Sequence, residues 1–197
     1  MDVSQPSLQP KRFNLNLVVD FLKKTWRDYL FLFLIGATII GLDQWTKALV
    51  RAHVQVGADW LPAGMTWLMP FARVRYWYNS GAAFGIFQNG NLVFTILAII
   101  VILLILYYFP RTIQEGWGLR LVMAMQFAGA SGNLIDRLRF GHVTDFISVG
   151  NFAIFNVSDA SISVGVAALI LWVWLKERAD KKQKAAIASP DNEAKVE

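Results

Sequence analysis

A nearly pure aliphatic stretch at 92–109 is the feature that most constrains what this chain can fold into. Pro110 and Arg111 end the stretch, and its length suits a helix that crosses the roughly 30 Å hydrocarbon core of a bilayer. The whole chain agrees, because 55% of its 197 residues are hydrophobic and its mean hydropathy is +0.41. An ordinary soluble domain of this length is less apolar. The sequence therefore predicts an integral membrane protein.

Three further stretches, at 29–49, 119–136 and 155–175, are predicted to cross the membrane. The stretch at 119–136 is the most polar of the three, since it is interrupted by Arg120, Gln126, Asn133 and Asp136. It also contains a run of small residues at 128–132, which lets helices approach closely in lipid. The predicted fold class is an α-helical integral membrane protein with four transmembrane helices, in a domain that spans 29–176.

The distribution of Lys and Arg predicts that both termini lie in the cytoplasm. With the N-terminus inside, thirteen of these residues fall in inner segments and five in outer segments, as the positive-inside rule expects. Residues 1–28 are then a cytoplasmic N-terminal extension with a short interfacial helix at 13–25, and 177–197 is a cytoplasmic tail that we expect to be disordered. The formal charge of +5 lies mainly in tails and loops, which suits an anionic membrane surface better than nucleic acid.

The predicted outer segment at 51–78 differs from a plain loop. It is rich in Trp and Tyr, which are enriched at the headgroup interface of membranes. These residues are Trp60, Trp67, Tyr76, Trp77 and Tyr78. Within the segment, 72–78 alternates enough to predict a β-strand. We expect 51–78 to form a small extracytoplasmic β-sheet that lies on the membrane.

The cysteine and histidine content excludes several kinds of chemistry. The chain has no cysteine, which removes disulfides, thiol nucleophiles and thiolate metal sites. Its two histidines, His53 and His142, lie far apart without partners at metal-ligand spacing. We therefore expect neither a metal nor another cofactor.

The acidic residues of the predicted membrane domain gather at one depth. Outside the tails and the inner loop they are Asp43, Asp59, Asp136, Asp145 and Asp159. With a helical rise of about 1.5 Å per residue, Asp43, Asp136 and Asp159 lie roughly 22 to 26 Å from the inner ends of their helices, near the outer face of the ~30 Å core. Asp145 falls in the short outer segment between two helices. Four carboxylates thus share one level, and intramembrane acids usually face a bundle interior or a wet cavity.

Structural pairing is one interpretation of Asp43 and Asp136. Asp43 has Lys47 at i+4, on the same helix face. The candidate partners of Asp136 are Arg137, Arg139 and the amide of Asn133. On this interpretation the two carboxylates hold helices together, whereas on the other they belong to the chemistry of the site.

Asp145 and Asp159 invite a catalytic interpretation, because neither has Lys or Arg within four residues in the sequence. Two carboxylates brought together cannot both ionise easily, so the pair holds a shared proton. One member can act as base toward water while the other protonates the carbonyl oxygen or the leaving amine of a peptide. Asn133 and Asn156 each stand three residues before an acid, so amide and carboxylate share a helix face. Each amide can orient a carboxylate, hold substrate, or form an interhelical hydrogen bond.

Five short motifs occur in order along 30–175. They are Asp-Gln-Trp-Thr-Lys at 43–47, Asn-Ser-Gly-Ala-Ala-Phe at 79–84, Gly-Asn-Leu-Ile-Asp-Arg at 132–137, Val-Thr-Asp-Phe at 143–146 and Phe-Asn-Val-Ser-Asp at 155–159. Together they resemble the motif set of bacterial lipoprotein signal peptidase, also called signal peptidase II. Each motif is moderately specific alone, and the ordered set is far more specific.

The resemblance implies an aspartic endopeptidase of the bacterial inner membrane, with its site near the extracytoplasmic face. Members cleave lipid-modified prolipoproteins just before the diacylglyceryl-cysteine and need no cofactor. The resemblance assigns catalysis to Asp145 and Asp159. It places the following residues in substrate binding or support of the site: Asp43, Lys47, Asn79, Gly81, Asn133, Asp136, Arg137 and Asn156. The expected partners are prolipoproteins and membrane lipids, with no nucleic acid, and we expect a monomer.

Three features depart from the family pattern. Ser158 stands where members usually have alanine, directly beside Asp159. The segment from Asp145 to Asp159 is shorter than in many members, and the N-terminal extension is longer. None of these departures removes a carboxylate or an amide of the motifs, so an active peptidase is still expected.

Three other functions fit the sequence less well than an aspartic peptidase. A proton-coupled transporter usually has charged groups spread in depth or an internal repeat, and the sequence shows neither. A non-catalytic assembly factor does not explain two acids without nearby cations. A Ser/Lys peptidase would use Lys47, but a lysine at i+4 from Asp43 stays charged and is a poor base. The candidate nucleophiles of such a peptidase are Ser80, Ser131, Ser158, Ser161 and Ser163.

Overall fold

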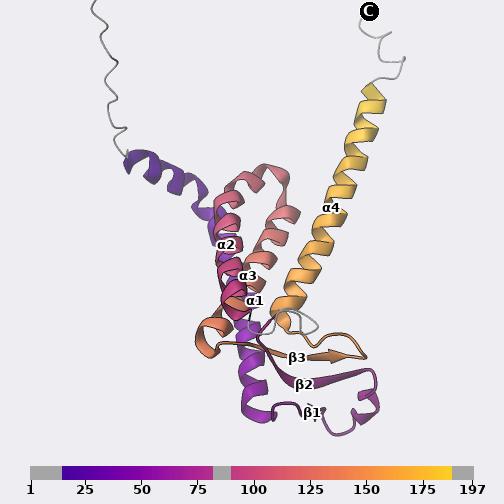
Figure 1. Cartoon of the computed structure of the whole chain (residues 1–197). Coiled ribbons are helices and arrows are strands. Elements are labelled where there is room, and N and C mark those ends of the chain that lie inside the picture. The colour runs from indigo at the N-terminus through magenta and orange to yellow at the C-terminus, as the bar shows by residue number, and fades with distance from the viewer. Residues whose placement is uncertain (1–14, 82–89, 188–197) are drawn as a thin grey trace, which may run out of the picture.

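The structure, a computed structural model, describes residues 15–81 and 90–187 (Figure 1). The helices of this part are α1 (Leu15–His53), α2 (Asn91–Tyr108), α3 (Trp117–Phe140) and α4 (Val157–Ile187), with short 3-10 segments η1 (Thr66–Leu68) and η3 (Phe109–Glu115). The strands are β1 (Asp59–Trp60), β2 (Ala72–Asn79) and β3 (Val143–Val149). The sheet lies at one end of the helices, below the start of α4 in Figure 1.

Three of the described helical segments are long and apolar enough to cross a membrane, namely Trp26–His53, Asn91–Thr112 and Val157–Lys182. Their large apolar side chains point mostly outward. On α2 only Ala98 and Ile105 are buried, whereas Leu92 and Leu103 are among many exposed aliphatic residues. Such a surface is stable only where lipid covers it, which agrees with the predicted membrane protein.

α3 is the central helix of the bundle, since it packs against α1, α2 and α4. Its buried residues are mainly small or polar, and they include Ala128, Gly129, Gly132, Asn133 and Asp136. The polar residues that the sequence shows in this helix therefore face other helices. They also explain why α3, unlike the other three helices, is not apolar enough to count as a span by composition alone.

Glycines at the α3–α4 interface let the two helices touch. A Cβ at Gly129 would lie 2.5 Å from the Ser158 carbonyl oxygen, and a Cβ at Gly132 would lie 2.1 Å from Ser158 Oγ and 2.8 Å from Asp43 Oδ2. The small-residue run at 128–132 thus has the role that its composition predicts. It brings the first turn of α4 against α1 and α3.

The predicted strand at 72–78 is present as β2, the middle strand of an antiparallel sheet with order β1-β2-β3. The register shifts between Val74, which pairs with Ile147, and Trp77, which pairs with Asp145. This irregularity places one extra residue on β2 directly beside Asp145. Bulges of this kind are common next to functional sites, where they re-aim side chains.

Two terminal predictions change. The interfacial helix expected at 13–25 is not separate, because α1 is one helix from Leu15 onward, and its first part lies at an angle to the rest in Figure 1. α4 continues to Ile187, so the first part of the 177–197 tail is helical rather than disordered; Ala, Lys and Glu favour helix there. Residues 1–14, 82–89 and 188–197, including part of the 79–84 motif, lie outside the described residues.

Candidate active site

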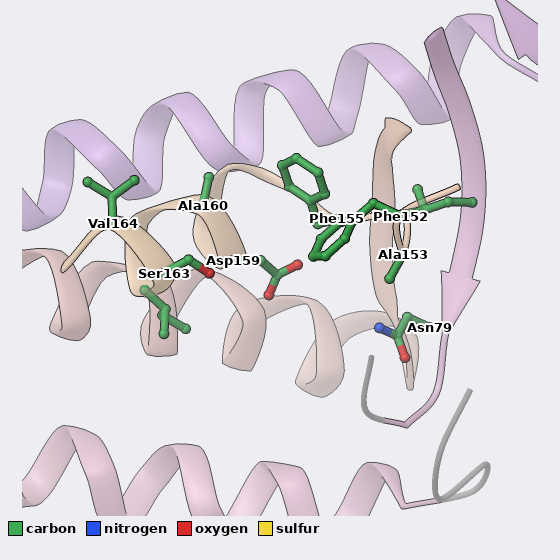
Figure 2. Close-up of a pocket in the computed structure, with 10 residues that line it drawn as sticks. Asn79, Phe152, Ala153, Phe155, Asp159, Ala160, Ser163 and Val164 are labelled. Atoms are coloured by element: carbon green, nitrogen blue, oxygen red, sulfur yellow. The ribbon is translucent and has the colours of Figure 1, made fainter. Parts of the chain in front are cut away.

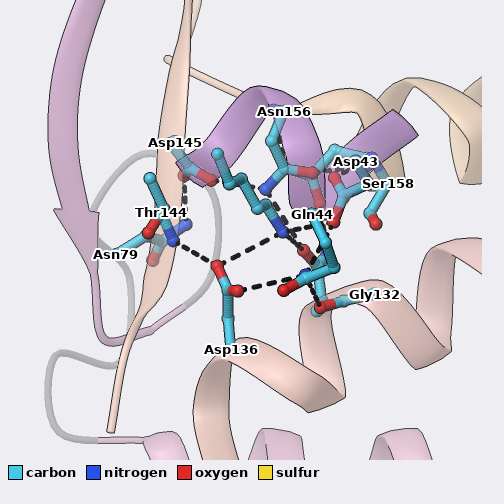
Figure 3. A network of polar contacts seen from close by, with 12 residues as sticks. Asp43, Gln44, Asn79, Gly132, Asp136, Thr144, Asp145, Asn156 and Ser158 are labelled. Carbon is cyan, nitrogen blue, oxygen red and sulfur yellow. Dashed lines mark hydrogen bonds and ion pairs between the residues drawn. The ribbon is translucent and has the colours of Figure 1, made fainter. Parts of the chain in front are cut away.

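Asp145 lies within β3, directly after Thr144. Gly141 ends α3 in a left-handed conformation (φ 76°) and donates its N–H to the Arg137 carbonyl, which turns the chain directly into β3. Asp145 is 1% exposed. Its Oδ2 accepts a hydrogen bond from Asn79 Nδ2 (2.8 Å) and its Oδ1 accepts one from Asn156 Nδ2 (2.7 Å). Amides therefore satisfy both oxygens (Figure 3).

Asp159 lies in the first turn of α4 and forms a reciprocal cap with Asn156. The Asp159 N–H donates to Asn156 Oδ1 (3.0 Å), and the Asn156 N–H donates to Asp159 Oδ2 (3.2 Å). This arrangement is the geometry of a capping box, in which two side chains satisfy backbone donors at a helix N-terminus. The Asn-x-x-Asp spacing therefore has a structural role that also fixes the direction of the Asp159 side chain.

Asn133 and Asn156 connect the two carboxylates. Asn133 Nδ2 donates to Asp159 Oδ1 (2.7 Å), while Asn133 Oδ1 accepts from Asn156 Nδ2 (3.1 Å). Asn156 Nδ2 also donates to Asp145, so one amide group contacts both Asn133 and Asp145. The two asparagines are buried and have little freedom to rotate. Asp145 and Asp159 are thus neighbours in one rigid hydrogen-bond network that draws on β3, α3 and α4.

A buried cation lies behind these amides. The Lys47 ammonium is 2.8 Å from Asp43 Oδ2 and 3.3 Å from Asp136 Oδ2, and it donates to Asn133 Oδ1 (3.1 Å). Lys47, Asp43 and Asp136 are all 0% exposed. An ammonium has three N–H donors, and each finds an acceptor here. The sequence predicted the Asp43–Lys47 ion pair. The same ammonium also contacts Asn133, the amide that binds Asp159.

Asp43 and Asp136 also hold backbone groups in place. Asp43 Oδ1 accepts the Ser158 N–H at the start of α4 (2.9 Å), and Asp136 Oδ2 accepts the Thr144 N–H on β3 (2.9 Å). Each carboxylate therefore fixes the residue next to Asp159 or Asp145. The sequence offered Arg137 and Arg139 as partners of Asp136, but its ion pairs in the structure are with Lys47 and, at 3.8 Å, with Arg51.

Two cavities meet at Asp159. One, of about 490 Å³, is lined by Phe152, Phe155 and the first turns of α4 (Figure 2). The other, of about 330 Å³, lies among α2, α3 and α4. Asn79 and Asp159 line both cavities. Asp159 is therefore the carboxylate that faces open space, and Asp145 lies behind it.

Gly81 and Arg137 belong to the smaller cavity. The Gly81 N–H donates to Asn79 Oδ1 (3.0 Å), which fixes the orientation in which Asn79 donates to Asp145. The Arg137 guanidinium lies 5.5 Å from the centre of the Phe94 ring and lines the cavity with Asp159. The structure thus brings all ten residues named from the sequence to one site.

The surroundings of Asp145 favour its neutral form. Burial, and then the nearby Asp159 charge, raise the pKa of Asp145 from its ordinary 3.8 to about 7, against the opposing hydrogen bonds from Asn79 and Asn156. A pKa near 7 lets this carboxyl gain and lose a proton at physiological pH. By contrast, Asp59 on the outer strand has its pKa lowered by Arg75 and Arg73.

Sequence reasoning missed Gln44, Arg51 and Thr144 as members of the network. Gln44 Nε2 donates to Asp43, to Asp136 and to the Gly132 carbonyl. Arg51 lies four residues after Lys47, so helical spacing was a signal that this cation shares its face. No comparable signal marks Thr144, whose contacts depend on how β3 packs against α1 and α3. Among residues 15–81 and 90–187 no three His, Cys, Asp or Glu side chains form a candidate metal site.

Comparisons with known proteins identify the family of the chain. The family model for signal peptidase (SPase) II matches residues 35–175. A lipoprotein signal peptidase of Halalkalibacterium halodurans is 37% identical over 158 residues, covering 78% of this chain and 98% of that protein. A lipoprotein signal peptidase of Enterococcus faecalis is 32% identical over 156 residues, covering 77% of this chain and 92% of that protein.

A solved structure described as a bacterial membrane enzyme, obtained by the in meso method at 2.3 Å resolution, has the same fold. It superimposes with a TM-score of 0.68 at 30% identity, covering 76% of this chain and 90% of its own. Sequence family, fold and the order of the motifs all agree, and they show that the chain belongs to the signal peptidase II family of proteases.

Proposed function

We propose that this protein removes the signal peptide from lipid-modified prolipoproteins, cleaving just before the diacylglyceryl-cysteine, and that Asp145 and Asp159 activate the attacking water. The observation that carries the proposal is the difference between the partners of Asp145 and Asp159 and those of the ion-paired Asp43 and Asp136. Within the described residues, Asp145 and Asp159 form no ion pair and are bound by amides that lead from one to the other. Such a pair can share one proton, as acid–base hydrolysis requires.

The proposed reaction follows from the shared proton. The ionised carboxylate removes a proton from water as the water oxygen attacks the scissile carbonyl carbon, and the protonated partner donates to the carbonyl oxygen. The carboxyl that took the water proton then donates it to the cysteine nitrogen as the C–N bond breaks. The other carboxylate removes a proton from a hydroxyl of the tetrahedral intermediate as the new carboxyl group forms, which restores the starting pair. Because Asp159 faces both cavities, water and the scissile bond reach the pair from its side.

The two cavities suit a substrate with apolar parts on both sides of the cut. Their linings are mostly apolar, and they meet at Asp159, where the scissile bond has to lie. Arg137 and Asn79 are the polar groups that can hold substrate carbonyl oxygens beside the reacting bond. Gly81 keeps Asn79 in the orientation for this role. We assign these three residues to substrate binding or support of the site.

We propose that α3 is the fourth transmembrane helix, since it packs against all three helices that are apolar enough to cross. Its polar side chains are then paired inside the bundle, as intramembrane polar groups require. With both termini in the cytoplasm of a bacterial cell, the sheet and the acids lie at the outer face of the inner membrane. Lipid-modified precursors arrive at that face, and we expect the protein to act there as a monomer.

The structure disfavours a Ser/Lys peptidase. Lys47 is enclosed by Asp43, Asp136 and Asn133, and within the described residues it makes no hydrogen bond to a serine. An ammonium whose N–H groups are directed at two carboxylates and an amide oxygen has no lone pair with which to act as a base toward a serine.

A cleavage assay on the purified full-length protein tests the proposal. The substrates are a lipid-modified precursor and the same precursor without its lipid, and mass spectrometry identifies the new N-terminus. We expect cleavage only of the lipid-modified form, just before the modified cysteine. Asp145→Asn and Asp159→Asn should each abolish it, by at least about 10³-fold.

The matched control is Asp59→Asn, which removes a carboxylate on the same sheet that is paired with Arg73 and Arg75. We expect this variant to cleave at the wild-type rate. Normal turnover by folded Asp145→Asn or Asp159→Asn would overturn the catalytic assignment. Equal cleavage of the precursor without lipid would overturn the substrate assignment.

A further inference from the structure

Arg51 is a second cation of the site, at the outer end of α1. Its Nη1 donates to Thr144 Oγ1 (3.0 Å) and lies 3.8 Å from Asp136 Oδ1. Its guanidinium also covers the Phe140 ring, with 4.5 Å between the guanidinium carbon and the ring centre. The side chain is 20% exposed. Three elements, α1, α3 and β3, therefore meet at this one guanidinium.

The charges of the buried cluster need this cation. Asp43 and Asp136 carry two negative charges, and Lys47 supplies one positive charge among fully buried side chains. An uncompensated buried charge is costly, so a second cation at Asp136 makes the cluster neutral. Arg51 supplies it from the same helix face as Asp43 and Lys47, at successive i+4 spacings.

Thr144 links this cluster to Asp145. The Thr144 N–H donates to Asp136 and its hydroxyl accepts from Arg51, so backbone and side chain are both held on the helix side of β3. Thr144 is 0% exposed. Successive side chains of a strand point to opposite faces, so Asp145 leaves the strand toward Asn79 and Asn156. Fixing Thr144 therefore fixes the origin of the Asp145 side chain.

We propose that Arg51 is a positioning residue for cleavage, which together with Asp136 clamps Thr144 and thereby sets the place of the Asp145 carboxylate. The inference deepens the proposed function and rests on the role given there to Asp145. Arg51 touches neither cavity at Asp159, so it acts only through Thr144 and Asp136. A guanidinium suits the task because its planar fork can donate to a hydroxyl and face a carboxylate together, whereas a lysine ammonium is a single point charge.

Kinetics of Arg51 variants test the proposal. We expect Arg51→Gln to lower kcat by about ten-fold with KM changed less than about two-fold, because substrate binding lies elsewhere. Arg51→Lys, which keeps the charge near Asp136, should recover part of kcat. The matched control is Arg139→Gln, since Arg139 stacks on the same Phe140 ring but forms no ion pair within the described residues. It should leave kcat unchanged.

The pH profile provides a readout that a general loss of stability would not move. Asp145 has its pKa held down by the hydrogen bonds from Asn79 and Asn156. If Arg51→Gln loosens these bonds, the pKa of Asp145 rises and the basic limb of kcat/KM moves to higher pH. The charged groups that act on Asp145 are Asp159 of α4, Lys47 of α1 and Arg137 of α3, and Arg51→Gln changes none of them.

A double-mutant cycle with Thr144→Val tests whether Arg51 acts through Thr144. Thr144→Val removes only the hydroxyl that Arg51 binds, so we expect about a three- to five-fold lower kcat. In this background Arg51→Gln should cost less than it does alone. Additive losses, or wild-type kcat and pH profile in folded Arg51→Gln, would overturn the positioning role. The two failures can be told apart. If Asp145→Asn kept activity, the proposed function itself would fail. If Asp145→Asn were inactive but the Arg51 variants were normal, only the positioning role of Arg51 would fail.

Discussion

Two pairs of carboxylates lie in one network, and they differ in what binds them. Asp43 and Asp136 are paired with Lys47, and Asp136 also with Arg51. Asp145 and Asp159 are bound by the amides of Asn79, Asn133 and Asn156, and Asp159 also by the Asn156 backbone N–H. Cations neutralise the charge of the first pair, whereas the second pair has only neutral donors as partners, an arrangement in which two carboxylates can share a proton. This difference is the basis on which we propose that one pair supports the site and the other performs the chemistry.

Asn133 and Asn156 connect the cation-bound carboxylates to Asp145 and Asp159, and their fixed orientations hold the second pair in place. Lys47 donates to Asn133 Oδ1, and this contact leaves Asn133 Nδ2 free to donate to Asp159. Asn156 is fixed in the same way by its bonds to Asn133 and to the Asp159 backbone. The cation thus orients the amides without contacting the second pair. A site built in this way keeps fixed geometry without a permanent positive charge on Asp145 and Asp159.

The largest expected effect comes from removing the buried cation. Lys47→Met leaves buried Asp43 without a cation and Asp136 with only Arg51, so we expect a loss of about 3–5 kcal/mol in the free energy of unfolding. The measurement is thermal unfolding in detergent, together with the amount of protein in the membrane. A variant with wild-type stability would show that the cation-bound pair does not hold the helices together.

The pH dependence of kcat/KM tests the second pair, Asp145 and Asp159. Because the pKa of Asp145 is raised to about 7, we expect the proposed shared proton to be lost as pH rises above that value. We expect kcat/KM to fall about ten-fold per unit there, and so to be about a hundred-fold lower at pH 9. The folded protein also binds more protons than the unfolded chain between about pH 4 and pH 7, so this carboxyl contributes less stability as pH rises through that window. A flat kcat/KM up to pH 9 would contradict the shared proton.

Asp136→Asn is a smaller perturbation of the cation-bound pair than Lys47→Met. The substitution keeps an oxygen for one donor but loses the charge that faces Lys47 and Arg51, so we expect about 1–3 kcal/mol lower stability and reduced but measurable cleavage. Unfolding and turnover should be measured on the same purified sample. A fully folded but wholly inactive variant would move Asp136 into the catalytic pair.

Ser158→Ala should have the smallest effect, and of opposite sign. The Ser158 hydroxyl is buried with no hydrogen-bond partner within the described residues, and it lies against Gly132. Replacing it by alanine removes an unsatisfied polar group, so we expect about 1 kcal/mol higher stability with unchanged turnover. A loss of activity would show that this hydroxyl takes part in the reaction.

Much of this site was predictable from the sequence because helical spacing determines which residues share a face. The i+4 relation placed Asp43 beside Lys47, and the depth argument placed Asp136 and Asp159 at their level. The alternation at 72–78 predicted β2 correctly. Periodic structure can be predicted in this way since each residue's direction follows from its number.

The remaining contacts depend on tertiary packing. Thr144 binds Arg51 and Asp136 only because β3 runs beside the ends of α1 and α3, and no local pattern encodes that approach. The partner of Asp136 was wrong for the same reason: sequence neighbours such as Arg137 point along a different face of α3. Helix ends were also misjudged, since the charged Ala-rich segment after Lys176 continues α4.

The most direct test of the account is the protonation of Asp145 itself. Infrared spectra of the purified protein, recorded between pH 5 and pH 9, report the carbonyl stretch of protonated carboxyl groups. We expect a protonated-carboxyl signal that disappears as pH rises through about 7. The signal should be missing from Asp145→Asn and kept in Asp59→Asn. An unchanged signal in Asp145→Asn, or no carboxyl that titrates near neutral pH, would contradict a proton-sharing pair.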